Sequence, residues 1–302
     1  MSMDATDPGW NPLQWLRKGA RWNTRRTEKG GLPLLAALVC GLLLIAAVFG
    51  TSITPYSETT IDFEAVMLPP AWQADGSLRH PLGTDQLGRD GLSRMVAGAQ
   101  VSLMVAVAAV VFGGVLGTFV GLIAGYLGGI VGAVLARVTD AFLALPFILM
   151  ALALVSAIGP GLWNIILVMI LTNWARYARL VRSEVIAIKE RDYVMLARIA
   201  GVSPVKIALR HVLPNAFNSV AILAVLDVGR AMMLESALSF LGLGVQPPSV
   251  SWGVMLADAK SFMGFAWWLA FFPGLAIFVS VLSFSAIGEW LHTKFDPMGR
   301  TA

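Results

Sequence analysis

The sequence predicts an all-α integral membrane protein with six transmembrane helices, and three observations predict this fold class. The chain of 302 residues is 57% hydrophobic but only 13% charged, whereas a soluble domain averages about 25% charged residues. It contains six apolar runs of the length that a helix needs to cross a hydrocarbon core about 30 Å thick. The basic and acidic residues also fall into different segments between these runs.

The first apolar run, Leu32–Ile53, follows a polar tail that comprises residues 1–31. The run is longer than the apolar region of a cleavable secretion signal, so we expect a retained anchor. Tryptophans and basic residues are mixed in the tail, and Asn11-Pro12 could cap a short helix that lies on the lipid interface. The alternative is a disordered tail whose positive charge only sets the topology.

Five further apolar runs complete the expected set of helices. They are Val101–Gly125, Val131–Ile158, Leu162–Ala178, Phe217–Leu241 and Ala266–Gly288. The tail and the segment after the fourth run are rich in Lys and Arg, whereas Thr54–Gln100 holds six acidic residues against three arginines. Because basic segments stay on the cytoplasmic side, both termini are expected there and Thr54–Gln100 is expected outside.

The expected organisation along the chain follows from these spans. It comprises a cytoplasmic tail (1–31), a first helix with an extracytoplasmic segment (32–100), a transmembrane core (101–290) that contains a cytoplasmic loop (179–215), and a cytoplasmic C-terminal tail (291–302).

No pattern in the sequence indicates a catalytic or nucleotide-binding site. The three histidines, at positions 80, 211 and 292, lack the spacing of metal ligands. There is no Gly-x-x-x-x-Gly-Lys-Ser/Thr phosphate loop and no Gly-x-Ser-x-Gly nucleophile turn. Cys40 is the single cysteine, which excludes an intrachain disulfide. The net charge is +4, and the Lys and Arg residues cluster beside the apolar runs. This distribution indicates a membrane surface rather than a nucleic acid partner.

The second apolar run contains a ladder of glycines with four-residue spacing. Its members are Gly113, Gly117, Gly121 and Gly125. This spacing places all of them on one helix face. Because a ridge without side chains lets a neighbouring helix approach closely, we interpret the ladder as a packing surface. The alternative is that sliding along the ridge opens and closes a pathway.

Charged residues within the apolar runs are costly unless they face protein or water. Asp227 and Arg230 lie three residues apart in the fifth run, so they can pair on one helix face, and Glu235 follows. Arg137 and Asp140 have the same spacing in the third run. Each pair could simply neutralise itself inside the bundle. Alternatively, Asp227, Arg230 and Glu235 line a water-filled translocation path.

The cytoplasmic loop has the pattern of two short helices joined at a glycine. Asp192 can cap a first helix that runs through Ala200, and Gly201 is suited to end it. Ser203 can cap a second helix with Pro204 at its first position.

This second helix is expected to extend to about Leu213 and to end before Pro214-Asn215. The product would be a compact elbow carrying Arg198, Lys206 and Arg210. The alternative is an amphipathic connector lying flat on the membrane. A sharp glycine bend favours an elbow that docks on another protein.

At these residues the chain resembles the permease subunits of binding-protein-dependent ABC importers, whose cytoplasmic loop has the pattern Glu-Ala-Ala-x₃-Gly-x₉-Ile-x-Leu-Pro. Aligned on Gly201, the matching residues are Ala197, Gly201, Leu213 and Pro214. The residues that depart from the pattern are Met195, Leu196 and His211. The missing acid at 195 weakens the case for a salt bridge at that position, whereas the spacing of the matched residues is kept.

Further stretches resemble the "C" permeases of dipeptide, oligopeptide and nickel importers. They are His80–Asp90 with Ser93-Arg94, Val101–Leu103, Glu235–Pro248, Ser251–Leu256 and Phe295-Asp-Pro297. Together the likeness runs over roughly residues 32–300, and only the N-terminal tail lies outside it.

The resemblance implies a type I importer in the inner membrane of a bacterium. Its partners would be a second, homologous permease, two ATPases that bind ATP and magnesium, and an external solute-binding protein. This chain would itself bind no cofactor. The implied cargo is a short peptide, with nickel complexes, glutathione or another small solute as alternatives. An ion-coupled carrier would leave the elbow without a purpose, and a membrane enzyme would need a nucleophile or metal site that the sequence does not offer.

Overall fold

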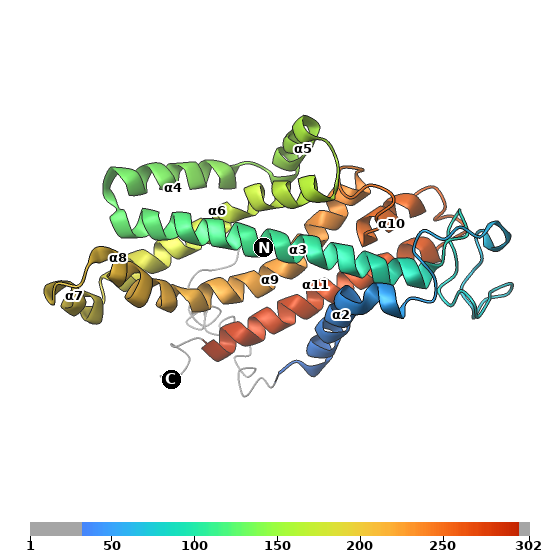
Figure 1. The fold of residues 1–302 in the computed structure, drawn as a ribbon, viewed down its shortest axis with the longest axis horizontal. Coiled ribbons are helices and arrows are strands. Elements are labelled where there is room, and N and C mark those ends of the chain that lie inside the picture. Colours follow the sequence, from blue (N-terminus) through green and yellow to red (C-terminus); the bar gives the residue numbers. More distant parts are fainter. Residues whose placement is uncertain (1–31, 296–302) are drawn as a thin grey trace, which may run out of the picture.

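The computed structural model describes residues 32–295, and helices dominate this part of the chain (Figure 1). The N-terminal tail, for which an interfacial helix and a disordered segment were both considered, lies outside the described residues. In chain order the elements are α2 (Leu34–Ile53), η1 (Phe63–Ala65), α3 (Gly91–Leu127), α4 (Gly129–Ala144), α5 (Phe147–Ile158), α6 (Leu162–Lys189), α7 (Asp192–Ile199), α8 (Pro204–Ile207), η2 (Ala208–Val212), α9 (Leu213–Phe240), α10 (Trp252–Ala259) and α11 (Trp268–Phe295).

All six predicted spans are largely helical, but they differ in how well each would cross a membrane alone. Among the described residues, α3, the continuous segment Pro204–Phe240 and α11 are each long and apolar enough to do so. The pair α4 and α5 would be a fourth span if it is counted as one. The apolar part of α2 is shorter, and α6 carries several arginines in its second half. The prediction of a helical, multi-span membrane protein is therefore confirmed at the level of fold class.

The third span was predicted as one helix over Val131–Ile158, and this prediction is wrong. The segment bends by 93° between α4 and α5. Leu145 adopts an extended conformation before Pro146. A residue that precedes proline is disfavoured in the helical region, and the proline ring removes a backbone donor. Pro146 therefore ends α4 and starts α5 in a new direction.

The second helix begins ten residues earlier than predicted, at Gly91 rather than at Val101. Asp90 occupies the N-cap position, and its side chain accepts a hydrogen bond from the Ser93 backbone. This cap satisfies a donor that a helix start would otherwise leave open. The extra turns carry α3 out of the apolar run and into the polar segment Thr54–Gln100.

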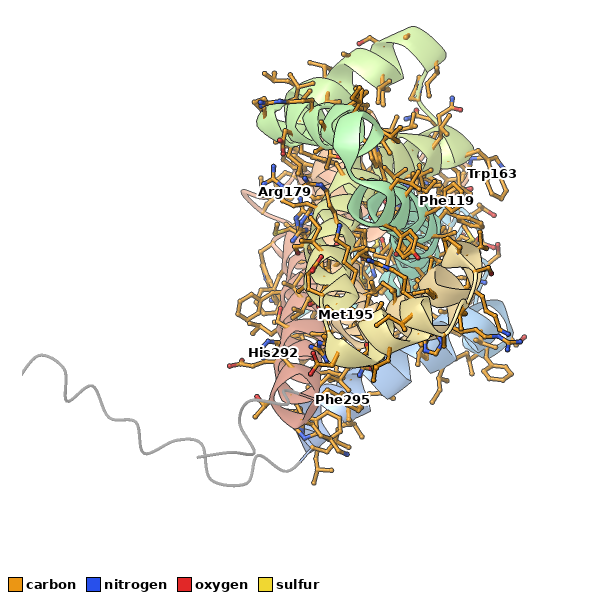
Figure 2. The ribbon with its side chains drawn as sticks, turned by 90° about the vertical axis from the view of Figure 1, so that its left-hand side faces the viewer. Phe119, Trp163, Arg179, Met195, His292 and Phe295 are labelled. Carbon is orange, nitrogen blue, oxygen red and sulfur yellow. The ribbon has the colours of Figure 1, made fainter. Side chains whose placement is uncertain are left out.

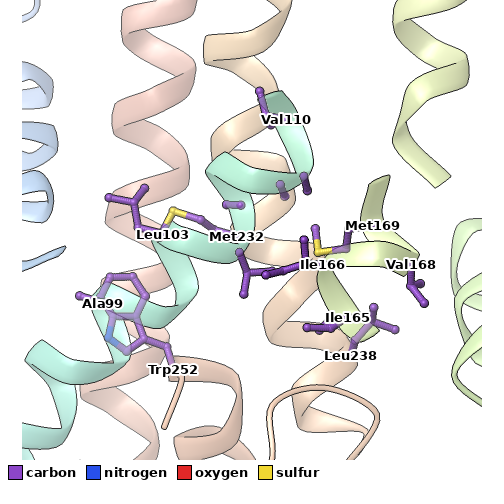
Figure 3. Packing of buried hydrophobic residues seen from close by; sticks show 14 of the residues in the cluster. Ala99, Leu103, Val110, Ile165, Ile166, Val168, Met169, Met232, Leu238 and Trp252 are labelled. Atoms are coloured by element: carbon purple, nitrogen blue, oxygen red, sulfur yellow. The ribbon is translucent and has the colours of Figure 1, made fainter. Parts of the chain in front are cut away.

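The core of the bundle lies where α3 packs between α6 and α9 (Figure 3). Ala106 and Ala109 of α3 are fully buried against this core, as are Ile165 and Val168 of α6 and Met232 of α9. Small residues on α3 facing large ones on its neighbours allow the helices to interdigitate without voids. The arrangement fixes α6 and α9 on α3 as one packed unit.

The two ends of the long axis have different characters (Figure 1). One end holds the irregular segment 54–90 and α10, and the other end holds α7 and α8. Large apolar side chains remain exposed on the sides between them, including Phe119 and Trp163 (Figure 2). Such a contiguous apolar exterior is the surface that a bilayer covers.

Candidate functional site

The elbow is bent by a glycine in a left-handed conformation. Gly201 has a φ of +74°, and its N–H donates to the carbonyl of Arg198 at 3.1 Å. The N–H of Val202 donates to the carbonyl of Ala197, also at 3.1 Å. This pair of hydrogen bonds is the Schellman arrangement that closes a helix C-terminus. The predicted bend at Gly201 therefore occurs where the sequence places it.

The caps around this bend differ in detail from those predicted. Asp192 is the first residue of α7 rather than its cap, and Arg191 stands at the N-cap position. Ser203 does occupy the N-cap position of α8 and Pro204 its first turn. The Ser203 side chain, however, makes no capping hydrogen bond. Pro204, whose φ is preset for a helix, accounts for the start of α8 without it.

The predicted stop before Pro214 is wrong, because the helix continues from Pro204 to Phe240. The π-helical turn η2 precedes the proline, and in it the N–H of Leu213 donates to the carbonyl of Ala208, five residues back. A π turn widens the helix locally, which relieves the clash between a proline ring and the preceding turn. The elbow is thereby joined rigidly to α9.

The inner face of the elbow is packed against the bundle. Val194, Ile207 and Val212 are buried and contact Val181 and Val185 of α6. The outer face carries exposed large apolar residues, of which Figure 2 labels Met195. These residues are Tyr193, Met195, Leu196, Ile199, Val205 and Leu209. A compact body with an apolar outer face has the properties of a docking element.

The glycine ladder of α3 lies against α6. A Cβ atom on Gly117 would collide with the carbonyl oxygen of Trp174, and one on Gly121 would lie 2.6 Å from that of Ala178. A Cβ atom on Gly125 would lie 2.8 Å from the Val185 side chain. Gly113 is different, because its closest contact would be an ordinary 3.5 Å to the Cβ atom of Asn173. The close approach of α3 and α6 thus depends on part of the ladder.

Asp227 is buried beside two arginines. Its carboxylate oxygen Oδ1 accepts a hydrogen bond from Nη1 of Arg176 on α6 at 2.5 Å. The predicted partner, Arg230, lies farther away, with Nη1 at 3.6 Å from the same oxygen, and donates to Asn173 at 3.3 Å. Sequence reasoning missed Arg176, although it lies inside the predicted span Leu162–Ala178.

Glu235 does not join this cluster. Its side chain is fully buried and accepts hydrogen bonds from Ser102 at 3.0 Å, Ser239 at 2.7 Å and Ser236 at 3.4 Å. No ion pair of Glu235 occurs within residues 32–295. Glu235 therefore ties α9 to α3 and lies apart from the other two residues of the candidate path.

The charges of the third predicted span also find a different partner. Asp140 accepts from Nη2 of Arg179 on α6 at 2.8 Å, and both side chains are more than half exposed. Arg137, the predicted partner, forms no ion pair with any described residue. Asp140 and Asp227 thus both pair with arginines of α6.

A cavity of about 970 Å³ opens beside these arginines, at the end of the bundle that holds the elbow. Its walls come from the end of α4, from α6, α9 and the end of α11, and Figure 2 labels Arg179, His292 and Phe295 among them. The polar residues that line it are Arg176, Arg179, Ser183, Glu184, Arg191, Asn215, Asn218, Ser219 and His292.

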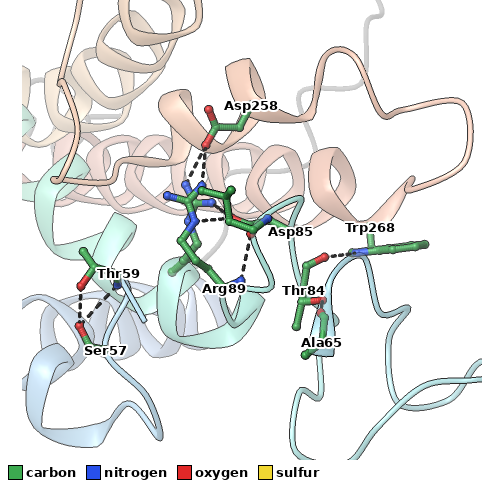
Figure 4. A network of polar contacts seen from close by, with 10 residues as sticks. Ser57, Thr59, Ala65, Thr84, Asp85, Arg89, Asp258 and Trp268 are labelled. Atoms are coloured by element: carbon green, nitrogen blue, oxygen red, sulfur yellow. Dashed lines mark hydrogen bonds and ion pairs between the residues drawn. The ribbon is translucent and has the colours of Figure 1, made fainter. Parts of the chain in front are cut away.

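A network of charges lies at the opposite end of the molecule (Figure 4). Arg94 is buried, and it bridges Asp85 of the irregular segment and Asp258 of α10, the latter at 2.9 Å. Nε of Arg89 donates to Asp85 at 2.7 Å. Nearby, Nδ1 of His80 lies 2.9 Å from the capping carboxylate of α3. The network holds the segment 54–90 against α3 and α10.

Comparison with known proteins identifies the family. Residues 117–298 match the family described as binding-protein-dependent transport system inner membrane component. The chain belongs to this family. The matched range contains the elbow, the cavity and most of the glycine ladder, whereas most of the charge network around Arg94 precedes it.

Curated relatives of this permease cover nearly its whole length. It is 44% identical over 276 residues to the dipeptide transport system permease protein DppC of Escherichia coli strain K12, which covers 91% of each chain. It is 37% identical to the di/tripeptide transport system permease protein DppC of Pseudomonas aeruginosa strain UCBPP-PA14, covering 93% of this chain and 92% of the relative.

A relative with a different named cargo is also close. The permease is 38% identical to the glutathione transport system permease protein GsiD of Escherichia coli O6:K15:H31, with 90% of this chain and 88% of the relative covered. The predicted resemblance to permeases of this branch is confirmed. The family is one of transport components of the inner membrane, so the chain is a permease subunit.

Proposed function

We propose that this permease forms half of the translocation pathway of an ATP-driven importer for short peptides. The elbow is the observation that supports the proposal most directly. It combines a glycine-closed bend, a buried inner face and an exposed apolar outer face. A transporter that worked without a soluble partner would gain nothing from such a surface. The named cargoes of the relatives, dipeptides and tripeptides, support the choice of substrate.

The partners follow from this assignment. Two cytoplasmic ATPases bind ATP and magnesium, and one of them receives the outer face of the elbow. A second, homologous permease completes the pathway, and the two permeases are embedded in the bilayer. A solute-binding protein delivers the peptide to the end that carries segment 54–90 and α10. The orientation places the elbow and both termini in the cytoplasm, in accord with the basic residues near them.

The mechanism is alternating access driven from the elbow. The segment Pro204–Phe240 is continuous, so α9 moves with the elbow as one lever. The elbow also packs on Val181 and Val185 of α6. Closure of the ATPases around ATP therefore displaces α6 and α9 together, and these two helices line the cavity. Nucleotide at one end and the loaded binding protein at the other bias the same two-state element.

The test begins with purification of the tagged permease and mass spectrometry of the proteins that accompany it. We expect two ATPases and a second permease. The complex is then reconstituted in liposomes, and uptake of a radiolabelled dipeptide is measured with the purified binding protein. Uptake should require both ATP and the binding protein. Uptake that follows an ion gradient without ATP would contradict the proposal.

Glutathione is the second candidate cargo, because the sequence identity to GsiD, 38%, is close to the 37% and 44% identity to the two peptide permeases. The same liposomes distinguish the two. Labelled glutathione and labelled dipeptide are offered separately, and each is challenged with an excess of the other unlabelled solute. Nickel added with and without a chelator tests the third cargo class. Efficient uptake of glutathione or nickel alone would replace peptide as the cargo.

A further inference from the structure

Arg176, which lines the cavity, belongs to a cluster with Asp227 and Arg230 that carries an excess positive charge. Arg176 and Arg230 share the single carboxylate of Asp227. The Asp227 side chain is only 2% exposed, whereas that of Arg176 is 34% exposed. A buried carboxylate thus anchors a guanidinium whose outer edge remains accessible. An unbalanced charge at such depth is stabilised when a mobile anion approaches it.

Arg176 is prepared to bind that anion. A guanidinium has five N–H donors in a fixed plane, and within residues 32–295 only Nη1 of Arg176 donates to a protein acceptor. The remaining donors belong to a side chain that lines the cavity. Planar, paired donors match the two oxygens of a carboxylate. Because Asp227 already holds the side chain in place, little conformational freedom is lost on binding.

The same cavity contains an acid that lacks a cationic partner. Glu184 of α6 lines the wall, and its Oε1 accepts a hydrogen bond from Ser219 of α9 at 2.8 Å. It forms no ion pair among the described residues. The cavity therefore presents a cationic group and an anionic group that are both incompletely neutralised by the protein. A ligand with charges of both signs complements this pattern.

The spacing of the two groups sets the length of that ligand. Arg176 and Glu184 are eight residues apart on α6, which places their Cα atoms about 12 Å apart along the helix axis. An extended peptide spans at most about 3.5 Å per residue, so two or three residues reach about 7–10 Å. The two side chains supply the remaining distance. The cavity, at about 970 Å³, has room for such a peptide.

We propose that Arg176 and Glu184 form a binding site for a zwitterionic di- or tripeptide on its way to the cytoplasm. Arg176 binds the C-terminal carboxylate, and Glu184 binds the N-terminal ammonium group. This inference rests on the proposed function and adds the residues that contact the cargo. An anionic lipid headgroup fits the site less well, because Glu184 would repel it. The headgroup of a zwitterionic lipid carries its two charges too close together to reach both residues.

The test is photo-crosslinking of the purified importer without nucleotide. The probe is a dipeptide that carries a diazirine side chain, and the labelled residues are identified by mass spectrometry. We expect labels on apolar cavity residues of α9, such as Ile222 and Leu223. Two variant proteins are compared with the wild type: Glu184→Gln, and Arg176→Gln combined with Asp227→Asn. The double substitution avoids a stranded buried charge.

Blocked probes assign each contact to one end of the peptide. We expect labelling of the cavity to fall about tenfold in either variant with the free dipeptide, as for loss of one charged hydrogen bond. With the N-acetylated probe, Glu184→Gln should have no further effect. With the C-terminally amidated probe, the double variant should have none. Arg137→Gln removes a charge outside the cavity and serves as the control.

The possible failures are distinguishable. If liposomes take up peptide but the labels fall outside the cavity, or respond to no variant, the site is refuted and the proposed function stands. If wild-type liposomes take up no peptide, the proposed function itself fails. If native mass spectrometry finds a phospholipid bound to the wild type but not to the Arg176→Gln, Asp227→Asn variant, the occupant is a lipid headgroup and the inference is overturned.

Discussion

Gly201 adopts a φ of +74°, and a Cβ atom built there would meet no heavy atom within 4 Å. Space is therefore available at this position, and the backbone conformation alone restricts the residue. Left-handed conformations cost an ordinary side chain about 1–2 kcal/mol, and asparagine tolerates them better than β-branched residues do. The function of the elbow should accordingly depend on the backbone conformation that residue 201 prefers and not on the size of its side chain.

We predict that Gly201→Asn retains most peptide uptake and that Gly201→Val loses most of it. The two side chains are of similar volume, but valine resists the conformation that closes α7. Uptake and ATP hydrolysis are measured on the same reconstituted importer. In Gly201→Val, hydrolysis should continue while uptake falls, because a distorted elbow transmits closure poorly. Equal loss in both variants would show that bulk on the outer surface matters, contrary to our argument.

At the scale of helices, two prolines show why the sequence predicts some elements and not others. Pro146 breaks its helix and Pro214 does not. The rule that proline disfavours a helix applies to both, but η2 absorbs the second one by widening a single turn. The π turn packs its Val212 in one cluster with Val181 and Val185 of α6, a contact that no local sequence pattern encodes. Periodicity and charge located the apolar runs, while tertiary contacts decided their ends.

The charged residues show the same division. The spacing of Asp227 and Arg230 on one helix correctly places them together, and the structure adds Arg176 from a helix distant in sequence. The contact between Arg94 and Asp258 likewise could not be predicted from spacing, because these two residues are 164 positions apart in the sequence. Pairing within a helix can be deduced from spacing, whereas pairing between helices requires knowledge of which faces meet.

The ladder of α3 offers a matched test at the scale of helix packing. Gly121→Ala should lower the melting temperature of the purified permease complex by several degrees, because the new methyl group would lie 2.6 Å from the backbone oxygen of Ala178. Gly113→Ala should leave the melting temperature unchanged or raise it, since its contacts are ordinary and alanine favours a helix by up to about 1 kcal/mol. Similar melting temperatures in the two variants would refute the close packing of α3 on α6 at Gly121.

At the scale of the whole molecule, the two ends of α3 contact two different parts of the protein. Its start is capped beside the charge network around Arg94, and its last turns pack with Val181 and Val185 next to the elbow. One rigid helix therefore connects the surface proposed to meet the binding protein with the part proposed to receive force from the ATPases. A signal between the two sides needs no moving chain of residues, only a change in how α6 and α9 pack on α3.

This connection predicts the effect of Arg94→Lys. Lysine keeps the charge, but it lacks the planar pair of nitrogens that bridges Asp85 and Asp258, so one charged hydrogen bond worth about 1.5–3 kcal/mol is lost. Segment 54–90 and α10 should then separate more easily. We expect the loaded binding protein to stimulate ATP hydrolysis several-fold less in this variant than in the wild type, with hydrolysis in its absence as the reference.

Arg79→Lys provides the control, because Arg79 is exposed on the same segment and forms no ion pair within residues 32–295. If stimulation of ATP hydrolysis falls equally in both variants, the binding protein contacts surface arginines directly and the network is not needed for the interaction. If only Arg94→Lys loses it, the interaction depends on holding the segment against α10. The second outcome would mean that the charge network around Arg94, although remote from the elbow, sets how strongly the binding protein can act on the helices proposed to be moved by the ATPases.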